Sequence, residues 1–332
     1  MKELKGKNIL LLAPNFFGYE FEIKKELENL GAKVFYFDER PKNDFLTKAC
    51  IRVNLKSFIQ KNINNYYQNI VNETKTKNFD YLFLISPETI DVEKIKKIKS
   101  LHLNIKVFIY IWDSIKNKIK TLDLLPFSDR FFTFDLNDKV KNKRIKFLPL
   151  FYIRDYAYIE NKDKPLYDIS FIGTMHSDRY SIVKSIDNSK FSVFAYFYSP
   201  SKVLFLLQKI LYKEFKKVSN DDISFKSLNK KEIISLIENS KCIIDIEHPL
   251  QQGLTMRTIE MLGARKKLIT TNKNIKEYDF YNTKNICIVD RDKPIISKDF
   301  LKLEYSEIEQ DIYEKYSLQN WIKNIFKECG VE

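Results

Sequence analysis

The amino-acid sequence predicts an α/β fold of two Rossmann-like domains, each a doubly wound parallel sheet, that face each other across a central cleft. Its 332 residues exceed the usual size of a single domain. In both halves, short apolar runs typical of buried parallel strands alternate with segments of helical length and pattern. A polar, charged stretch at 151–165 interrupts this alternation once. Ligands of such folds bind where the carboxyl ends of the strands meet, so we expect the ligand in the cleft.

The predicted elements of the first half follow local signals. The run KNILLLA is the first strand, and Gly31 ends the helix after it as a C′ glycine. Strands are expected at 7–13, 33–37, 80–85, 106–112, 130–133 and 146–148, and helices at 20–30, 58–77 and 91–100.

The second half repeats the pattern. Asn229 with Glu232 three residues later is typical of a capping box at a helix start. We expect one domain over 1–155, a second over 156–315, and a C-terminal helix within 316–332 that packs back towards the first. Strands are expected at 167–172, 191–197, 241–246, 267–271 and 285–289, and helices from about 178, over 201–218, from 229, over 255–262 and over about 318–327.

The net charge of +13 suits nucleic acids, anionic lipids and phosphorylated small molecules as partners. A compositional bias towards lysine explains the charge equally well. The lysines are spread along the chain, and most of the 26 Phe and 19 Tyr residues fall in apolar strands. Because no nucleic-acid-binding module is recognisable, a nucleic-acid partner is the weaker hypothesis.

The sequence shows no metal, redox or membrane-spanning motif. No HxxxE or HxH motif is present, and no apolar run approaches the length of about 18 residues that a spanning helix needs. These patterns predict a cytoplasmic protein of a reducing compartment, soluble or peripheral to a membrane. No CxxC pair occurs among the four cysteines, Cys50, Cys242, Cys287 and Cys329.

The stretch DIEHPLQQGLTMRTIEMLGARKKLITTN, residues 245–272, carries the strongest signal for a binding site. A buried strand ends in a polar loop, and Gly253 stands at the entry to a helix, whose start attracts anions. Arg257 would add charge-assisted bonds to a diphosphate, and Glu260 would accept two ribose hydroxyls. Alternatively, Arg257 and Glu260 form an ordinary ion pair on the helix surface. Gly263 is expected to end the helix.

A second strand–glycine–helix stretch, FIGTMHSDR, covers 171–179. Its loop would hold phosphates, and a cationic side chain would offset charge on a leaving group. Alternatively, it is an ordinary turn in which the glycine permits the bend. His248 follows another buried strand, and its place on a loop favours a ligand contact. The candidate residues of the 171–179 stretch are Gly173, Thr174, His176 and Arg179.

Residues 245–272 resemble the donor-binding signature of GT-B glycosyltransferases, in which two acidic residues are separated by seven others around a helix that begins with glycine. Glu260 matches the second acid, and Gln252 stands at the first position, where an amide still binds a sugar hydroxyl. Together with FIGTMHSDR and YIWDS (110–114), the stretch is similar to bacterial transferases that build lipopolysaccharide core, capsule or exopolysaccharide, of the family 4-like or CgeB-like kind.

This resemblance implies a metal-independent glycosyltransferase with no cofactor besides its nucleotide-sugar co-substrate. The first domain would bind a glycan or lipid-linked glycan acceptor, and the second the donor. A GT-B enzyme that modifies nucleotide sugars, such as an epimerase, is the alternative. The donor-binding positions that the resemblance to GT-B glycosyltransferases implies are Gly173, Thr174, His176, Arg179, His248, Gln252, Gly253, Leu254, Thr255, Arg257 and Glu260.

Two acidic residues of the first half are candidate bases for a reaction that inverts the anomeric centre. Asp113 follows a buried strand beside Trp112, and Glu20 starts the first helix. Each has a structural alternative, Asp113 as the N-cap of a following helix and Glu20 as a complement to the helix dipole. In a retaining reaction Asp113 would only position the acceptor.

Residues 201–218, SKVLFLLQKILYKEFKKV, predict a basic amphipathic helix. Such a helix either lies on an anionic membrane surface, as would suit a lipid-linked acceptor at the cytoplasmic face of the inner membrane, or packs its apolar face on the second domain. We favour packing on the second domain. The apolar stripe consists of Val203, Leu207, Ile210, Leu211, Phe215 and Val218.

Overall fold

The computed structural model describes residues 3–52, 55–116, 118–139, 142–186, 189–249 and 251–327. The chain divides into two compact units. The first consists of Met1–Pro149 together with Leu318–Glu332, and the second of Leu150–Ser317. The chain therefore passes from the first unit to the second after Pro149, earlier than the expected boundary at 155, and returns after Ser317.

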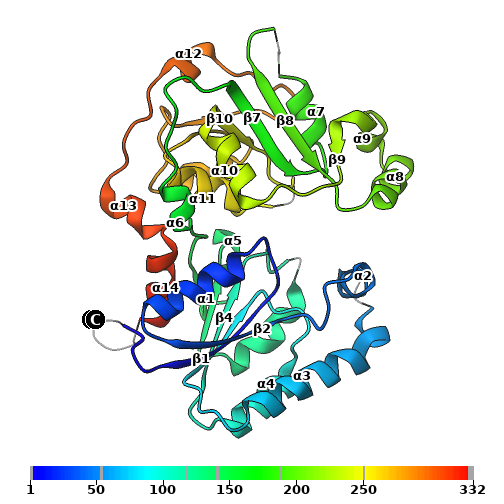
Figure 1. Cartoon of the computed structure of the whole chain (residues 1–332), viewed down its shortest axis with the longest axis vertical. Coiled ribbons are helices and arrows are strands. Elements are labelled where there is room, and N and C mark those ends of the chain that lie inside the picture. The colour runs from blue at the N-terminus through cyan, green and yellow to red at the C-terminus, as the bar shows by residue number, and fades with distance from the viewer. Residues whose placement is uncertain are drawn as a thin grey trace. The chain divides into compact units, whose positions relative to one another are not determined.

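Six parallel strands form the sheet of the first unit, in the order β2-β1-β3-β4-β5-β6 (Figure 1). Residues 9–13 and 81–85 are buried on both faces of this sheet, which is why the sequence shows unbroken apolar runs there. The strands are β1 (Asn8–Ala13), β2 (Lys33–Asp38), β3 (Tyr81–Ile85), β4 (Lys106–Ile111), β5 (Arg130–Thr133) and β6 (Ile145–Phe147).

Helices cover both faces of the first sheet. Residues of α3 and α4 pack with strand residues such as Leu10 and Leu82 in one apolar core. On the opposite face, Trp321 of α14 packs edge-on against Tyr110, with the ring centroids 4.7 Å apart. The helices of this unit are α1 (Tyr19–Asn29), α2 (Phe45–Arg52), η1 (Lys56–Ile59), α3 (Gln60–Thr74), α4 (Val92–Leu101), η2 (Ile119–Phe127), α5 (Leu136–Lys139) and α14 (Leu318–Phe326).

The second unit also holds six parallel strands, in the order β12-β11-β10-β7-β8-β9. β7 lies where this order changes direction, because β8 and β9 follow on one side of it and β10 to β12 on the other. The strands are β7 (Tyr167–Thr174), β8 (Val193–Tyr198), β9 (Ile223–Ser224), β10 (Ser240–Asp245), β11 (Lys267–Thr270) and β12 (Ile286–Ile288).

Several helices of the second unit begin at residues whose side chains cap them. Asn229 and Glu232 form the predicted capping box, with each side chain bonded to the other residue's backbone N–H, which confirms that prediction. The helices are α6 (Arg154–Ala157), α7 (Arg179–Lys184), α8 (Lys202–Leu211), α9 (Lys213–Lys216), η3 (Asn220–Asp222), α10 (Lys230–Glu238), α11 (Met256–Gly263), η4 (Lys273–Glu277), α12 (Lys298–Lys302) and α13 (Gln310–Lys315).

The structure differs from the sequence-based expectations at several elements. The helix α2 was not predicted. The single helix expected over 201–218 is two helices, because Tyr212 takes an extended backbone conformation, with φ −119° and ψ 131°, between α8 and α9. The strand expected to end at 172 continues through Gly173 and Thr174 as part of β7.

Two glycines near helix ends have different roles. Gly31, with φ 101°, follows α1 as the predicted C′ residue, and its N–H donates to the carbonyl of Glu28. Gly263 ends α11 as predicted, although the positive φ at this helix end, 46°, belongs to Arg265. A Cβ at Gly263 would lie 2.6 Å from Cγ of Tyr152, so close ring packing requires the glycine.

Candidate functional site

Four neighbouring strands of the second sheet, β12, β11, β10 and β7, run in parallel, so their carboxyl ends lie at one edge. In open α/β sheets, ligands bind beyond this edge at the point where the strand order changes direction. Here that point lies beside β7. The polar residues that follow these four strands define the candidate site.

Arg291, after β12, binds residues that follow two other strands. Its Nη1 donates to both carboxylate oxygens of Asp178, each at 2.8 Å. Its Nη2 donates to the backbone carbonyl of Glu247 at 2.7 Å and to Glu247 Oε1 at 2.6 Å. Glu247 Oε2 accepts from the hydroxyl of Thr271 after β11, at 2.5 Å. The four strand ends are therefore joined by one ionic network.

Sequence reasoning missed Asp178, Glu247 and Arg291. Each stands a few residues after the end of β7, β10 or β12. The rule that singled out His248, a polar residue just past a buried strand, applies equally to Glu247 and Arg291. Applied to every strand of the second half, it would have found both.

The start of α11 is fixed to the end of β10. Thr255 is the N-cap, and its hydroxyl accepts from the N–H of Thr258 at 3.2 Å and donates to Asp245 Oδ2 at 2.5 Å. The hydroxyl of Thr258 donates to the same carboxylate oxygen at 2.8 Å. The helix expected over 255–262 is observed at Met256–Gly263, and Gly253 lies in the loop two residues before its N-cap. The anion-attracting helix start lies at Thr255 and Met256, at the sheet edge.

Arg257 and Glu260 lie on the first turns of α11 and pair with each other. Nη1 of Arg257 donates to Glu260 Oε2 at 2.6 Å. The alternative of an i, i+3 ion pair is thereby confirmed, but the side chains are only 17% and 6% exposed, so the pair is not on the helix surface. A mostly buried pair holds both groups in fixed positions next to the helix start.

Arg179, the first residue of α7, ties the end of β7 to that of β10. Its Nε donates to the carbonyl of Ile246 at 2.7 Å, and its Nη1 to the carbonyl of Thr174 at 2.9 Å. Burial lowers the pKa of Arg179 to about 10, so its guanidinium is charged at pH 7. A cation is thus held beside the loop that follows β7.

Gly173 is required for close packing. A Cβ at this position would lie 2.9 Å from Cζ of Phe171 and 3.2 Å from Nη1 of Arg179. The alternative that glycine permits the bend of this turn is wrong, because the residue with positive φ is Ser177, at 48°. Gly173 therefore makes room for the guanidinium of Arg179.

His176 and His248 bring together the loops after β7 and β10, with their ring centroids 5.6 Å apart. Burial, reinforced by the charge of Arg179, lowers the pKa of His176 to about 3. The imidazole of His176 is therefore neutral at pH 7, and its Nδ1 shares a hydrogen bond with the Ser177 hydroxyl at 2.9 Å. His248 is exposed at the same edge.

The loop before α11 is held by its backbone. The Nδ2 of Asn274 donates to the carbonyl of Gln252 at 3.0 Å, and the Nδ2 of Asn272 donates to the carbonyls of Gln252 and Gly253, each at 3.3 Å. The Gln252 side chain is exposed, whereas Leu254 is buried, at 2% exposure. Of these predicted donor residues, Gln252 presents its side chain to solvent and Leu254 does not.

In the first unit, Asp113 follows β4 and is partly exposed. Its Oδ1 accepts from the N–H of Ser114 at 2.8 Å. The alternative that Asp113 caps a following helix is wrong, because η2 begins several residues later with Lys118 at its N-cap. The carboxylate thus closes a local turn at the carboxyl end of a central strand.

Glu20, the second residue of α1, is fully buried. Its Oε2 accepts from the N–H of Phe16 at 3.1 Å, and its Oε1 has no hydrogen-bond partner in the part of the chain that is described. The Phe16 ring lies 5.4 Å from that of Trp112. Glu20 therefore holds the loop of Phe16, and this loop meets the one that carries Asp113 through the aromatic contact.

A third acidic residue of the first unit, Glu39, was missed by the sequence reasoning. Its side chain is fully buried after β2, and its Oε1 accepts from the N–H groups of Glu88 at 2.7 Å, of Ile90 at 3.0 Å, and of Thr89. Burial raises the pKa of Glu39 to about 7, although these hydrogen bonds oppose the shift. Glu39 thus fixes the loop after β3.

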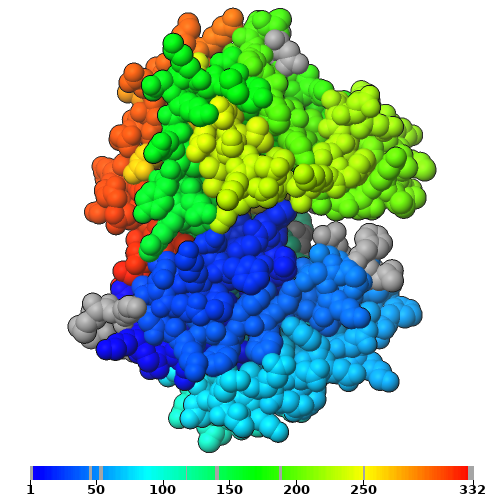
Figure 2. Space-filling model, in the orientation of Figure 1, coloured from blue at the N-terminus to red at the C-terminus, as the bar shows by residue number. Residues whose placement is uncertain are grey.

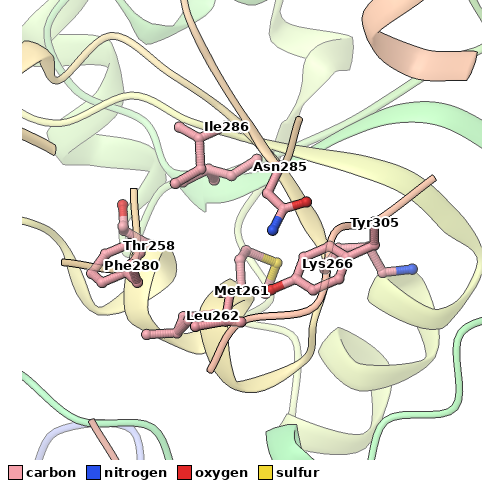
Figure 3. A pocket seen from close by; sticks show the side chains of 10 residues that line it. Thr258, Met261, Leu262, Lys266, Phe280, Asn285, Ile286 and Tyr305 are labelled. Atoms are coloured by element: carbon pink, nitrogen blue, oxygen red, sulfur yellow. The ribbon is translucent and has the colours of Figure 1, made fainter. Parts of the chain in front are cut away.

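A cavity behind α11 is lined by Thr258, Met261, Asn285 and Tyr305, among others (Figure 3). It has room for about one water molecule. The Thr258 hydroxyl, as noted above, bonds to Asp245 at the sheet edge. A nucleotide sugar is far too large for this cavity, so the candidate site remains the open edge of the sheet.

Within the described ranges, no group of three or more His, Cys, Asp or Glu side chains could hold a metal ion. No helix there is long and apolar enough to cross a membrane. Cys50, Cys242 and Cys287 are free thiols, and Cys329 lies outside the described residues.

No protein-family model and no curated protein matches the sequence. Solved structures do match. A glycosyltransferase from Rickettsia africae is similar over 97% of each chain, with 16% identity and a TM-score of 0.59. The chain has the GT-B fold.

Two further GT-B structures contain nucleotides or sugars. Anabaena HepE in complex with UDP and glucose is 10% identical, with a TM-score of 0.51, over 96% of this chain and 95% of that one. The UDP-GlcNAc 2-epimerase of Methanocaldococcus jannaschii in complex with UDP-GlcNAc and UDP is 11% identical, with a TM-score of 0.53, over 97% and 99%. The predicted class, an α/β fold of two Rossmann-like parallel-sheet domains, is confirmed.

Proposed function

We propose that the protein is a metal-independent glycosyltransferase that moves a sugar from a nucleotide-sugar donor to a bacterial cell-surface glycan. The observation that carries the proposal is the start of α11 at the carboxyl edge of β10, with Arg257 and Glu260 on its first turns. GT-B structures with bound UDP and glucose or UDP-GlcNAc support a donor of this chemical class. By resemblance of its motifs, the enzyme is of the family 4-like or CgeB-like kind, acting in the synthesis of lipopolysaccharide core, capsule or exopolysaccharide.

The donor diphosphate is assigned to the start of α11. As the bond between the sugar and the diphosphate breaks, negative charge grows on the leaving diphosphate. The helix start and the Arg257 guanidinium, 17% exposed, stabilise that charge. Because Thr255 and Thr258 anchor the helix start to Asp245, these groups need little rearrangement during the reaction. We assign no metal or other cofactor to the site.

The loop after β7 supplies the other side of the donor site. Arg179 donates its described hydrogen bonds to the carbonyls of Thr174 and Ile246. We therefore assign it to positioning the loops that follow β7 and β10. A neutral His176 beside it offers a hydrogen bond to the nucleotide without the desolvation cost of a second cation. Gln252, which is exposed, is assigned to a sugar hydroxyl.

The first unit is assigned to the acceptor. Asp113 is the better candidate base, because it is partly exposed, whereas Glu20 is fully buried. In an inverting reaction Asp113 takes the proton of the acceptor hydroxyl that attacks the sugar. In a retaining reaction it positions that hydroxyl. We place Glu20 in a supporting role, since it holds the loop of Phe16.

A ligand screen tests the donor site. Thermal unfolding would be measured with UDP, GDP, CMP and the sugars that each carries, followed by calorimetric titration of any nucleotide that stabilises the protein. A bound nucleotide at about 100 times its Kd raises the free energy of unfolding by about 2.7 kcal/mol. We expect one nucleotide family to do so. If none of these ligands shifts the unfolding transition, the assignment of the donor site is wrong.

An epimerase is the second candidate, because a UDP-GlcNAc 2-epimerase shares the fold. Incubation of the bound nucleotide sugar without any acceptor separates the two activities. A glycosyltransferase returns the same sugar, apart from slow hydrolysis, whereas an epimerase yields the epimer, which chromatography resolves. We also propose a cytoplasmic location, at the inner face of the inner membrane where the acceptor is lipid-linked.

A further inference from the structure

The segment 201–218 is the one motif of the sequence that the donor and acceptor sites leave unused. It forms α8 and α9, which stand together at the margin of the second unit beyond β9 (Figure 1; yellow-green in Figure 2). The preferred expectation was that its apolar stripe packs on the second domain. For α8 that expectation is wrong.

The apolar residues of α8 point in two directions. Phe205, together with Phe215 and Val218, is buried in the core of the second unit. Five other apolar side chains are between 44% and 71% exposed. Their spacing of three and four residues places them on one continuous face of the helix, away from Phe205. They are Val203, Leu206, Leu207, Ile210 and Leu211.

The helix that carries this apolar face is well fixed. Ser201 caps its start, with the hydroxyl accepting from the N–H of Leu204 at 3.3 Å. At its other end, Lys209 Nζ donates to the carbonyl of Val218 at 2.8 Å and to Asn220 Oδ1 at 3.0 Å. Because the helix is already formed and held, binding a partner costs little conformational entropy.

The charges around the apolar face have one predominant sign. Residues 201–217 contain five lysines and one acidic residue, Glu214. Lys202, Lys213 and Lys216 are exposed, as is Lys217. Tyr212, 50% exposed between the two helices, has the side chain that is enriched at the boundary between lipid and water. An exposed apolar face surrounded by lysines is complementary to a partner that has an apolar layer beneath a layer of negative charge.

An anionic phospholipid surface has that chemistry. Lysines near such a surface are attracted to the headgroups, and an apolar helix face enters the boundary with the acyl chains. A second copy of the chain fits less well, because it would bring two rings of lysines together. We propose that α8, with the lysines of α9, docks the second unit on an anionic membrane. The inference goes beyond the proposed donor chemistry and does not depend on it.

Vesicle co-sedimentation tests the proposal. The full chain would be mixed with vesicles of phosphatidylcholine alone, or of phosphatidylcholine with about one-third phosphatidylglycerol, whose negative charge attracts lysine. We expect binding to the anionic vesicles that weakens as salt is raised, and little binding to the neutral ones. Equal binding to both, or to neither, overturns the proposal.

Two variants of the segment separate the apolar from the ionic contribution. Leu207→Asp with Ile210→Asp should weaken vesicle binding at least about tenfold, because two apolar side chains no longer enter the lipid. Lys213→Gln with Lys217→Gln should weaken it about fivefold per lysine. Since all four side chains are exposed, the unfolding transition and nucleotide affinity should be unchanged, which separates this result from the donor site.

Leu103→Asp is the matched control, because Leu103 is 88% exposed on the first unit and far from α8 in the chain. It should bind vesicles as the unsubstituted protein does. Wild-type binding by the Leu207→Asp, Ile210→Asp variant overturns the proposal. So does a concentration-dependent dimer, seen by analytical ultracentrifugation, that the same variant abolishes, since the apolar face would then be an interface between copies.

Discussion

The guanidinium of Arg291 lies 2.6 Å from Oε1 of Glu247 and so ties the end of β12 to the end of β10. The same guanidinium binds both oxygens of Asp178, just before α7. Three loops at the edge of the second sheet therefore share one cation. Loops joined in this way keep a fixed spacing, which a site for an extended diphosphate needs.

We expect Arg291→Ala to lower the free energy of unfolding by about 2 kcal/mol, because it leaves Glu247, which is mostly buried, without its cation. Donor affinity should fall as well, because the loops would no longer be held together. Urea unfolding and calorimetric titration measure the two effects. Arg291→Lys keeps the charge but loses the forked geometry of the guanidinium. Its unfolding free energy and donor affinity should therefore lie between those of the wild type and those of Arg291→Ala. An unchanged unfolding energy would contradict the network.

Arg257→Ala should weaken binding of the nucleotide about tenfold to a hundredfold, since a charge-assisted bond to phosphate is lost. The affinities for the nucleoside diphosphate and for the nucleoside should be compared, because only binding of the diphosphate group depends on Arg257. Lys302→Ala is a matched control, since Lys302 and Asp299 form an i, i+3 pair that is highly exposed. That substitution should leave both affinities unchanged.

Glu260→Gln is expected to raise the Kd of nucleotides with an intact ribose more than that of their 2′-deoxy forms. The assigned carboxylate accepts bonds from ribose hydroxyls, and the amide that replaces it accepts them less strongly. Isothermal titration of both ligand series gives the ratio. Equal losses for the ribose and deoxyribose series would remove Glu260 from the ribose site.

The stability of the first unit should depend on pH through Glu39. Burial raises its pKa from 4.5 to about 7, so folding favours the protonated carboxyl. This contribution is fully present below pH 4.5 and is lost as the pH rises through 7, by up to about 3 kcal/mol. Glu39→Gln has no such titration. The difference in unfolding free energy between variant and wild type, measured from pH 4.5 to 8, should therefore shift in favour of the variant, and a constant difference would refute the assignment.

Gly263→Ala should destabilise the second unit by about 1–3 kcal/mol, because its Cβ would lie 2.6 Å from the Tyr152 ring. In a chain that already carries Tyr152→Ala, the same substitution should cost much less, since the ring is gone. Denaturant unfolding of the four proteins gives this coupling energy. Equal costs in both backgrounds would mean that the glycine serves another purpose.

Much of the fold was predictable because buried parallel strands leave unbroken apolar runs. The strand Arg130–Thr133 matches its prediction, and most others agree within two residues. The helix α2 was missed although its start carries a capping signal, Asp44, whose Oδ1 accepts from the N–H of Thr47 at 2.9 Å. The break at Tyr212 was missed because the apolar pattern of 201–218 continues across both helices although the backbone does not.

The candidate site was predictable in part. The stretch around Arg257 and Glu260 was found because a strand, a loop and a helix start follow one another within it. The pairing of Arg291 with Glu247 was missed because the two lie far apart along the chain, and only the parallel order of β10, β11 and β12 brings them together. The burial of the Arg257–Glu260 pair also depends on the tertiary fold, which spacing along a helix does not reveal.

The return of the chain to the first unit has a consequence for how the protein is made. Trp321 and Phe326 cover Tyr110 and Phe83, aromatic side chains of strands synthesised some two hundred residues earlier. Until α14 leaves the ribosome, the part of that face around Tyr110 and Phe83 lacks this cover. The N-terminal sheet is therefore finished last, after the whole second unit has had time to form.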